Sequence, residues 1–181
     1  MRFPILMKDE YTDAQREFAE NIASGPRGEL RGPFLALIHS PELGERVQKL
    51  GEYLRFQSKL SPKLTELGVL LVARKYQSKN MWHSHRALAL KAGLDPVIIA
   101  SIALNCRPEN MSEDESCIYN FCTDLFIDGN VSEAHFEKIV DRWGRHGAVD
   151  LIALVGYYIM LSYVFNVSQL PLPDLAIPFQ P

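Results

Sequence analysis

The sequence is poor in cysteine, and its three cysteines form no Cys-x-x-Cys pair. Cys106, Cys117 and Cys122 are an odd number, which is more typical of reduced thiols in the cytoplasm than of a disulfide framework. We therefore expect structural thiols and a cytoplasmic protein.

Clustered positive charge and targeting signals are also missing. The chain carries 19 lysines and arginines against 22 aspartates and glutamates, which gives a net charge of −3 and a pI of about 6.0. A nucleic-acid-binding protein would need a basic face. Residues 1–13 lack the long apolar core and the small-residue cleavage site of a signal peptide. We expect no nucleic-acid partner and no secretion signal.

Long apolar runs are limited to one, "DLIALVGYYIMLSYVFNV", residues 150–167. A membrane-spanning helix needs about 20 apolar residues, and this run is slightly shorter. It begins at Asp150, contains three tyrosines and a serine, and has no basic anchor on its C-terminal side. These features favour a buried core helix or a subunit-interface helix over a membrane span, so no membrane partner is expected.

No segment shows convincing β-strand alternation, and no Asn-Gly turn joins two β-rich runs. Helix-start signals are frequent instead. Thr12 with Gln15 and Ser112 with Glu115 have capping-box spacing, and Ser-Pro pairs at 40–41 and 61–62 provide an N-cap followed by a first-turn proline. The expected helical segments are 11–24, 41–58, 62–77, 78–92, 96–105, 113–129, 133–147 and 148–166, and residues 34–40 are a short apolar segment. Segment 96–105 is β-branched enough to be ambiguous, but its Asp-Pro start favours helix.

The predicted fold class is all-α, a single-domain bundle of seven or eight helices. Residues 1–29 form an N-terminal helix and linker, residues 30–167 form the main domain, and residues 168–181 form a Pro-rich tail. The last eleven residues contain four prolines, so the tail should be extended.

Glu66 lies on the apolar face of its helix, which it shares with Val69 and Ala73. A carboxylate there loses water and needs a partner, and such carboxylates can transfer protons near neutral pH. The face pattern alone favours a structural ion pair with Arg74 or Arg86 over a catalytic role.

The segment "SKNMWHSHRALALKAGL" (78–94) places His85 on the apolar face of the next helix, with Met81 and Leu88. His83, two residues earlier, projects elsewhere. A regular helix binds one metal through histidines four residues apart, and no acidic third ligand is suitably spaced, so no metal is expected. By itself, His85 is more typical of a hydrogen-bonded core histidine than of a catalyst.

The run "LSPKLTELGVLLVARKYQSKNMWHSHRALALKAGL" (60–94) resembles the core motif of the carboxymuconolactone decarboxylase family, which includes the alkylhydroperoxidase-D-like proteins. The flanking segments extend the resemblance over roughly residues 30–167. The positions that carry it are Glu66-Leu67, Val72-Ala73-Arg74, Trp82, His85 and Ala92-Gly93-Leu94.

This resemblance implies an alkylhydroperoxidase-D-like helical bundle in which Glu66 and His85 meet over one pocket as the catalytic residues. His85 would be the general acid/base, and Glu66 would orient it or relay a proton. The implied enzyme needs no cofactor and acts on a small organic acid or lactone, with decarboxylation favoured over isomerisation or hydrolysis. The family also implies a homo-oligomer, a trimer or a hexamer.

One departure from the family pattern bears on activity. Redox members carry Cys-x-x-Cys followed four residues later by histidine, and those cysteine positions fall on Ser78 and Met81 in this sequence. A thiol peroxidase needs a thiolate and a resolving thiol. Cys106 could approach the site only if the chain folded back unexpectedly. A peroxidase-like antioxidant is therefore disfavoured, and a non-catalytic binding protein on the same scaffold is the third reading.

Four further residues are candidates for substrate contacts: Ser78, Met81, Trp82 and His39. Trp82 is expected mainly to pack beside the pocket. For His39 a structural or interface role is favoured over reaching the pocket. A substrate carboxylate would need an arginine, and the sequence does not rank the candidates. These candidates are Arg31, Arg74 and Arg86.

Overall fold

The computed structural model describes residues 1–171 and 179, and within them the chain forms eight α-helices, one short 3₁₀ helix and no strand. The predicted all-α class is confirmed. The 3₁₀ helix spans Lys8–Glu10. The α-helices are α1 (Asp13–Ser24), α2 (Phe34–Leu37), α3 (Pro41–Phe56), α4 (Pro62–Lys75), α5 (Lys79–Lys91), α6 (Pro96–Ala103), α7 (Glu113–Asp128) and α8 (Glu133–Ser168). Most of the tail that was expected to be extended lies outside the described residues.

Local signals fix most helix starts. Both predicted capping boxes form, at the start of α1 and at the start of α7. At α4, the Leu64 backbone N–H donates to the Ser61 hydroxyl over 3.5 Å, and proline occupies the first turn. The cap predicted at Ser40 is only partly right, because Ser40 holds the N-cap position of α3 but its side chain makes no capping hydrogen bond.

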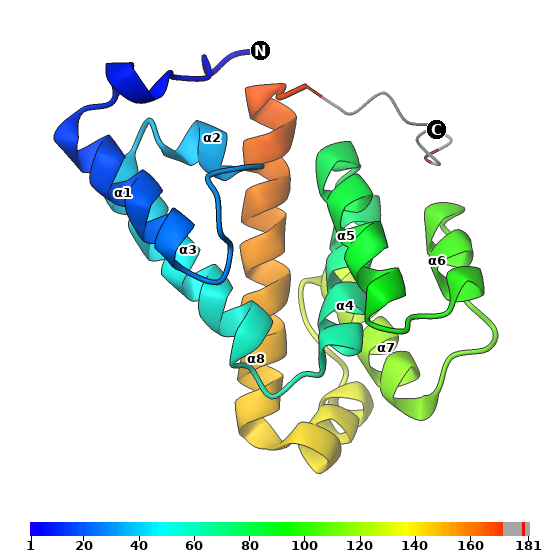
Figure 1. The fold of residues 1–181 in the computed structure, drawn as a ribbon. Helices are drawn as coiled ribbons and strands as arrows, with labels where there is room; N and C mark the ends of the chain where they lie inside the picture. The colour runs from blue at the N-terminus through cyan, green and yellow to red at the C-terminus, as the bar shows by residue number, and fades with distance from the viewer. Residues whose placement is uncertain (172–178, 180–181) are drawn as a thin grey trace.

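Helix α4 lies at the centre of the fold, where it packs against α5, α6, α7 and α8. All of its residues from 64 to 73 are buried, as expected for a helix that is surrounded by others. Figure 1 shows α8 running between α1–α3 on one side and α4–α6 on the other. Phe18 and Ile22 of α1 belong to the same buried core as the helices of residues 30–167, so the N-terminal helix is part of one body.

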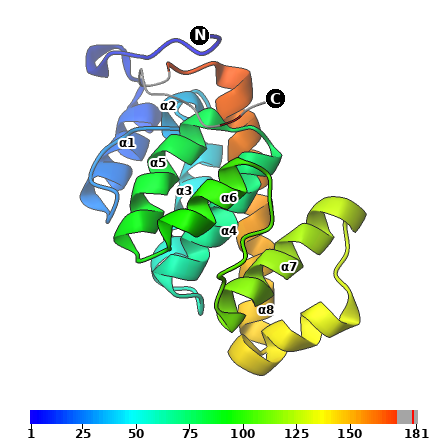
Figure 2. The same cartoon turned by 90° about the vertical axis from the view of Figure 1, so that its right-hand side faces the viewer.

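The two helices predicted at 133–147 and 148–166 join as α8, with a kink at Gly144 rather than a break after Gly147. Gly144 has φ 67° and ψ 177°, a conformation that glycine adopts without steric penalty. Gly147 remains helical, and a Cβ there would lie 2.2 Å from the Trp143 Cβ. The chain changes direction at the kink. The part of α8 before Gly144 therefore projects together with α7 at one end of the molecule (Figure 2).

The apolar part of α8 is long and hydrophobic enough to cross a membrane by length and composition, and 56% of that window is buried inside the fold. Its buried residues include Leu151, Leu154, Leu161 and Phe165. The helix therefore contributes to the core, as expected from the sequence.

Candidate active site

Glu66 and His85 meet across the hairpin formed by α4 and α5. The turn between the two helices contains Gln77 with a left-handed φ of 49°, and the Ser78 backbone N–H donates to the Ala73 carbonyl over 2.8 Å. This short turn sends the chain back along α4, so side chains on the facing sides of the two helices can touch. The His85 Nδ1–H donates to Glu66 Oε2 over 2.6 Å.

The pair is largely shielded from water, with side-chain exposures of 12% for His85 and 8% for Glu66. A carboxylate only accepts hydrogen bonds, so this contact places the imidazole proton on Nδ1 and leaves Nε2 as the nitrogen available to a ligand. The ion pair expected from the face pattern, Glu66 with Arg74 or Arg86, is absent from the described part of the chain, where Glu66 is held by histidine instead. Two of the predicted residues are thus brought together in one place.

Two tyrosines of α8 continue the site beyond His85. The Tyr158 ring packs edge-on against the His85 ring with centroids 5.1 Å apart, and the Tyr157 ring packs edge-on against Tyr158 at the same distance. Burial raises the pKa of both phenols, although Arg27 and Arg55 act in the opposite direction. Both hydroxyls therefore stay protonated at neutral pH and can act as hydrogen-bond donors.

His85 lines a cavity of about 840 Å³. Its walls come from the loop between α1 and α2, the start of α2, the C-terminal end of α3, most of α5 and the C-terminal part of α8. This volume is in the range of natural ligand sites, about 300–1,000 Å³. The histidine of the pair is thus accessible to a ligand that enters the cavity.

The other predicted contact residues are divided between the cavity and the rest of the protein. Met81 and Trp82 line the cavity and are otherwise buried, at 1% and 2% exposure. Ser78 is completely buried in the α4–α5 turn and is not part of the lining. His39 is exposed and is not brought to the cavity; its Nε2–H donates to the Pro4 carbonyl over 3.0 Å. A substrate contact at His39 is therefore not supported.

Among the arginines predicted from sequence, Arg31 and Arg86 line the cavity and Arg74 does not. The Arg74 Nε–H donates to the Ala103 carbonyl over 2.9 Å, which ties α4 to α6. Arg31 lies 3.2 Å from Glu29, and both side chains are largely exposed.

Sequence reasoning missed Arg27, Arg55, Tyr157 and Tyr158, all of which line the cavity. Arg27 lies in an irregular Gly/Pro-rich loop where no periodicity indicates direction. The adjacent tyrosines did carry a signal, because two aromatic residues with polar tips inside an apolar helix need polar surroundings for their hydroxyls.

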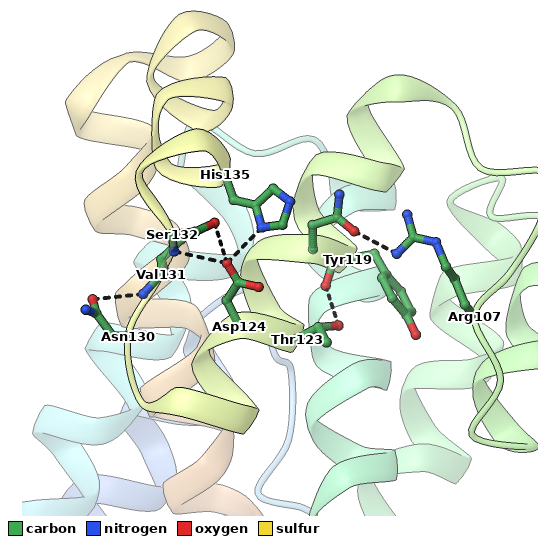
Figure 3. Close-up of polar contacts among 9 residues, drawn as sticks. Arg107, Tyr119, Thr123, Asp124, Asn130, Val131, Ser132 and His135 are labelled. Atoms are coloured by element: carbon green, nitrogen blue, oxygen red, sulfur yellow. Dashed lines mark hydrogen bonds and ion pairs between the residues drawn. The ribbon is translucent and has the colours of Figure 1, made fainter.

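A second cluster contains serine, histidine and aspartate but lacks the arrangement of a catalytic triad (Figure 3). Asp124 Oδ2 accepts from the Ser132 backbone N–H at 3.0 Å, from the Ser132 hydroxyl at 2.8 Å and from His135 Nδ1–H at 2.7 Å. The hydroxyl therefore donates to the carboxylate instead of to a general base. These bonds lower the pKa of Asp124 and fasten the start of α8 to α7. The cluster is structural.

Within the described residues, no three histidine, cysteine, aspartate or glutamate side chains are placed to bind a metal ion together. No protein-family model matches the sequence, and no curated protein matches it.

Proposed function

We propose that this chain is a cofactor-free enzyme in which Glu66 and His85 act as an acid–base pair on a small organic acid or lactone, with decarboxylation favoured. The observation that carries this proposal is the 2.6 Å hydrogen bond between two shielded side chains, one of which faces a ligand-sized cavity. The sequence resemblance to the carboxymuconolactone decarboxylase family, in a branch without the redox cysteines, supports the same proposal.

In the proposed reaction the substrate carboxylate leaves as carbon dioxide, and its bonding electrons pass to an adjacent carbonyl or conjugated system. His85, protonated on Nε2, then delivers a proton to the carbon, and solvent returns one to the imidazole. Glu66 holds the ring through Nδ1 and stabilises the imidazolium state. The hydroxyl of Tyr158, whose ring packs against His85, is a candidate donor to the developing oxyanion.

The peroxidase alternative is opposed by the positions of the thiols. Cys117 and Cys122 are buried in α7, and Cys106 is exposed after α6; none of them lines the cavity. Burial raises the pKa of Cys122 to about 12, so it is no thiolate at neutral pH. A non-catalytic binding protein would not need an acid–base pair at the cavity wall, which favours the enzyme.

The test is turnover of β-keto and β,γ-unsaturated acids in heavy water, followed by carbon dioxide release and by mass spectrometry of the product. Wild type should incorporate one deuteron at the carbon that lost the carboxylate. His85→Ala should lose about 10²–10⁴-fold in rate, and Glu66→Gln should also lose activity, with unchanged circular dichroism. Full activity in either variant would refute the role of that residue.

We further propose a homo-oligomer, a trimer or a hexamer, as the resemblance implies. Val149, Ile152, Tyr163 and Val167 leave an exposed apolar strip along α8. Apolar strips on a protein surface commonly mark contacts with another subunit. Light scattering should give a mass that is a multiple of 20.5 kDa, and a monomer mass would reject the proposal.

A further inference from the structure

The wall of the cavity beyond His85 is cationic. It is lined by Arg27 and Arg55, and by the exposed ion pair of Arg31 with Glu29. Lys79 and Arg86 of α5 also line the cavity. Arg27 and Arg55 are near enough that each opposes the other's charge. Two cations on the wall of one cavity are unfavourable unless an anion lies between or beside them. This part of the cavity is thus suited to a negatively charged group.

Arg27 is the cation best placed to bind that group. Its guanidinium stacks on the Phe34 ring, 4.7 Å from the centroid, which fixes its plane. Its Nε and Nη2 atoms are buried and have no hydrogen-bond partner within the described residues. The Tyr157 hydroxyl lies at the same place, beside Gly51, and is also buried without an aligned hydrogen bond. These enclosed groups interact with each other, and the Tyr157 hydroxyl oxygen can accept from Arg27, so they hold the guanidinium in place. Arg27 Nη1 is not among the enclosed atoms and makes no hydrogen bond within the described residues, so it is the donor that a ligand oxygen can reach.

Much of the remaining lining is apolar. Phe34, Leu88, Leu161 and Phe165 contribute side chains to the cavity wall, and its volume is about 840 Å³. A small diacid would leave most of such a cavity filled with water. An organic anion with a single charged head and a large apolar body matches both the cationic end and the apolar walls.

We infer that this cavity binds a monocarboxylate with a bulky aliphatic or aromatic body, its carboxylate held by Arg27, which Phe34 and Tyr157 fix in place. The tyrosine pair links this anchor to His85, because each ring packs on the next with centroids 5.1 Å apart. The anchored carboxylate is therefore not the group that reacts at His85. In such a ligand a lactone or another group on the body would meet His85, which corresponds to the isomerisation or hydrolysis alternative of the proposed function rather than to decarboxylation. The inference rests on the proposed function for the role of the site, but the binding of the anion does not require turnover.

The test uses straight-chain carboxylic acids of about four to about twelve carbons and the matching primary alcohols, titrated by calorimetry into the full chain. Affinity should rise about fourfold per added methylene until the cavity is filled. Each acid should bind at least about tenfold more tightly than its alcohol, as a charge-assisted hydrogen bond requires.

Arg27→Met keeps an apolar stem without the charge and should abolish the preference for acid over alcohol. Arg31→Met is the matched control, because Arg31 is exposed and already paired, and it should keep the preference. Equal binding of acids and alcohols by the wild type would overturn the inference whether or not the Arg27 variant folds. Three other results would also overturn the inference. A short dicarboxylate could bind more tightly than the monocarboxylates, folded Arg27→Met could keep the preference for acid over alcohol, or no probe could bind with a Kd below about 1 mM.

The same titration with His85→Ala separates this inference from the proposed function. The acids should bind this variant as they bind wild type, since the Tyr157 and Tyr158 rings lie between the anchor and His85. Binding without any turnover by wild type would leave the anion site standing and refute only the enzymatic role.

Discussion

Gly51 lies where α3 passes closest to Tyr157 and Arg27, and alanine at this position should destabilise the protein. A Cβ there would lie 2.0 Å from the Tyr157 hydroxyl oxygen and 2.5 Å from Arg27 Nη2. Tyr157 is only 4% exposed and is backed by the Tyr158 ring, so it has little room to withdraw. Its hydroxyl would have to move by about 1.4 Å to reach an ordinary contact distance of 3.4 Å.

Two effects of opposite sign set the size of the change. Overpacking a rigid buried contact costs about 2–3 kcal/mol of the free energy of unfolding. Replacing glycine by alanine inside a helix returns about 1 kcal/mol. The net destabilisation is about 1–2 kcal/mol, which for a chain of this length lowers Tm by roughly 2–8 °C.

Gly156→Ala is the matched control, because Gly156 is also helical but a Cβ there would meet no atom within 4 Å. This variant should gain about 0.5–1 kcal/mol in the free energy of unfolding. Thermal unfolding followed by circular dichroism measures both changes under the same conditions. If Gly51→Ala were as stable as Gly156→Ala, the close approach of α3 to Tyr157 would be wrong.

Three other predictions follow from single contacts. Burial raises the pKa of Glu115, but hydrogen bonds from Lys63 (2.9 Å) and Ser112 outweigh burial and hold the pKa below its usual value. Because the folded-state pKa is lowered, this stabilisation is present at neutral pH and is lost as pH falls below about 4. Urea unfolding midpoints measured at several pH values should therefore fall less steeply with acid in Lys63→Met than in wild type. Leu67→Ala, at a completely buried position of α4, should cost about 2–5 kcal/mol by urea unfolding, and a smaller loss would indicate a loosely packed core. His39→Ala should leave carboxylate affinity unchanged in calorimetry, whereas weakened binding would return His39 to the site.

The predicted helix starts succeeded where the signal was local. The capping box at Thr12 and the Ser-Pro start at Ser61 need only residues within one turn, so the sequence contains all the information. The kink in α8 was misplaced because Gly144 and Gly147 are equally permissive as amino acids. The kink at Gly144 places Trp143 so close to Gly147 that a Cβ at Gly147 would lie 2.2 Å from the Trp143 Cβ, and the sequence does not show which glycine takes which role.

The candidate site was likewise predicted only in part. The family resemblance singled out Glu66 and His85 as a pair, the face pattern placed each on an apolar helix face, and the short turn between their helices brought them together. The arginine partner predicted for Glu66 was wrong, because helical periodicity shows which side of a helix a residue occupies but not which neighbouring side chain reaches it. Arg74 instead donates to a backbone carbonyl of α6.

The sequence by itself determined the all-α class and most helix starts, since each depends on residues close together in the chain, and the resemblance it carries pointed to Glu66 and His85. Only the tertiary structure decided the shape and charge of the cavity. Arg27 and Tyr157 are far apart in sequence and meet because α3 and α8 pack against each other at Gly51. Such long-range contacts depend on how whole helices pack against one another, and local sequence patterns do not encode that packing.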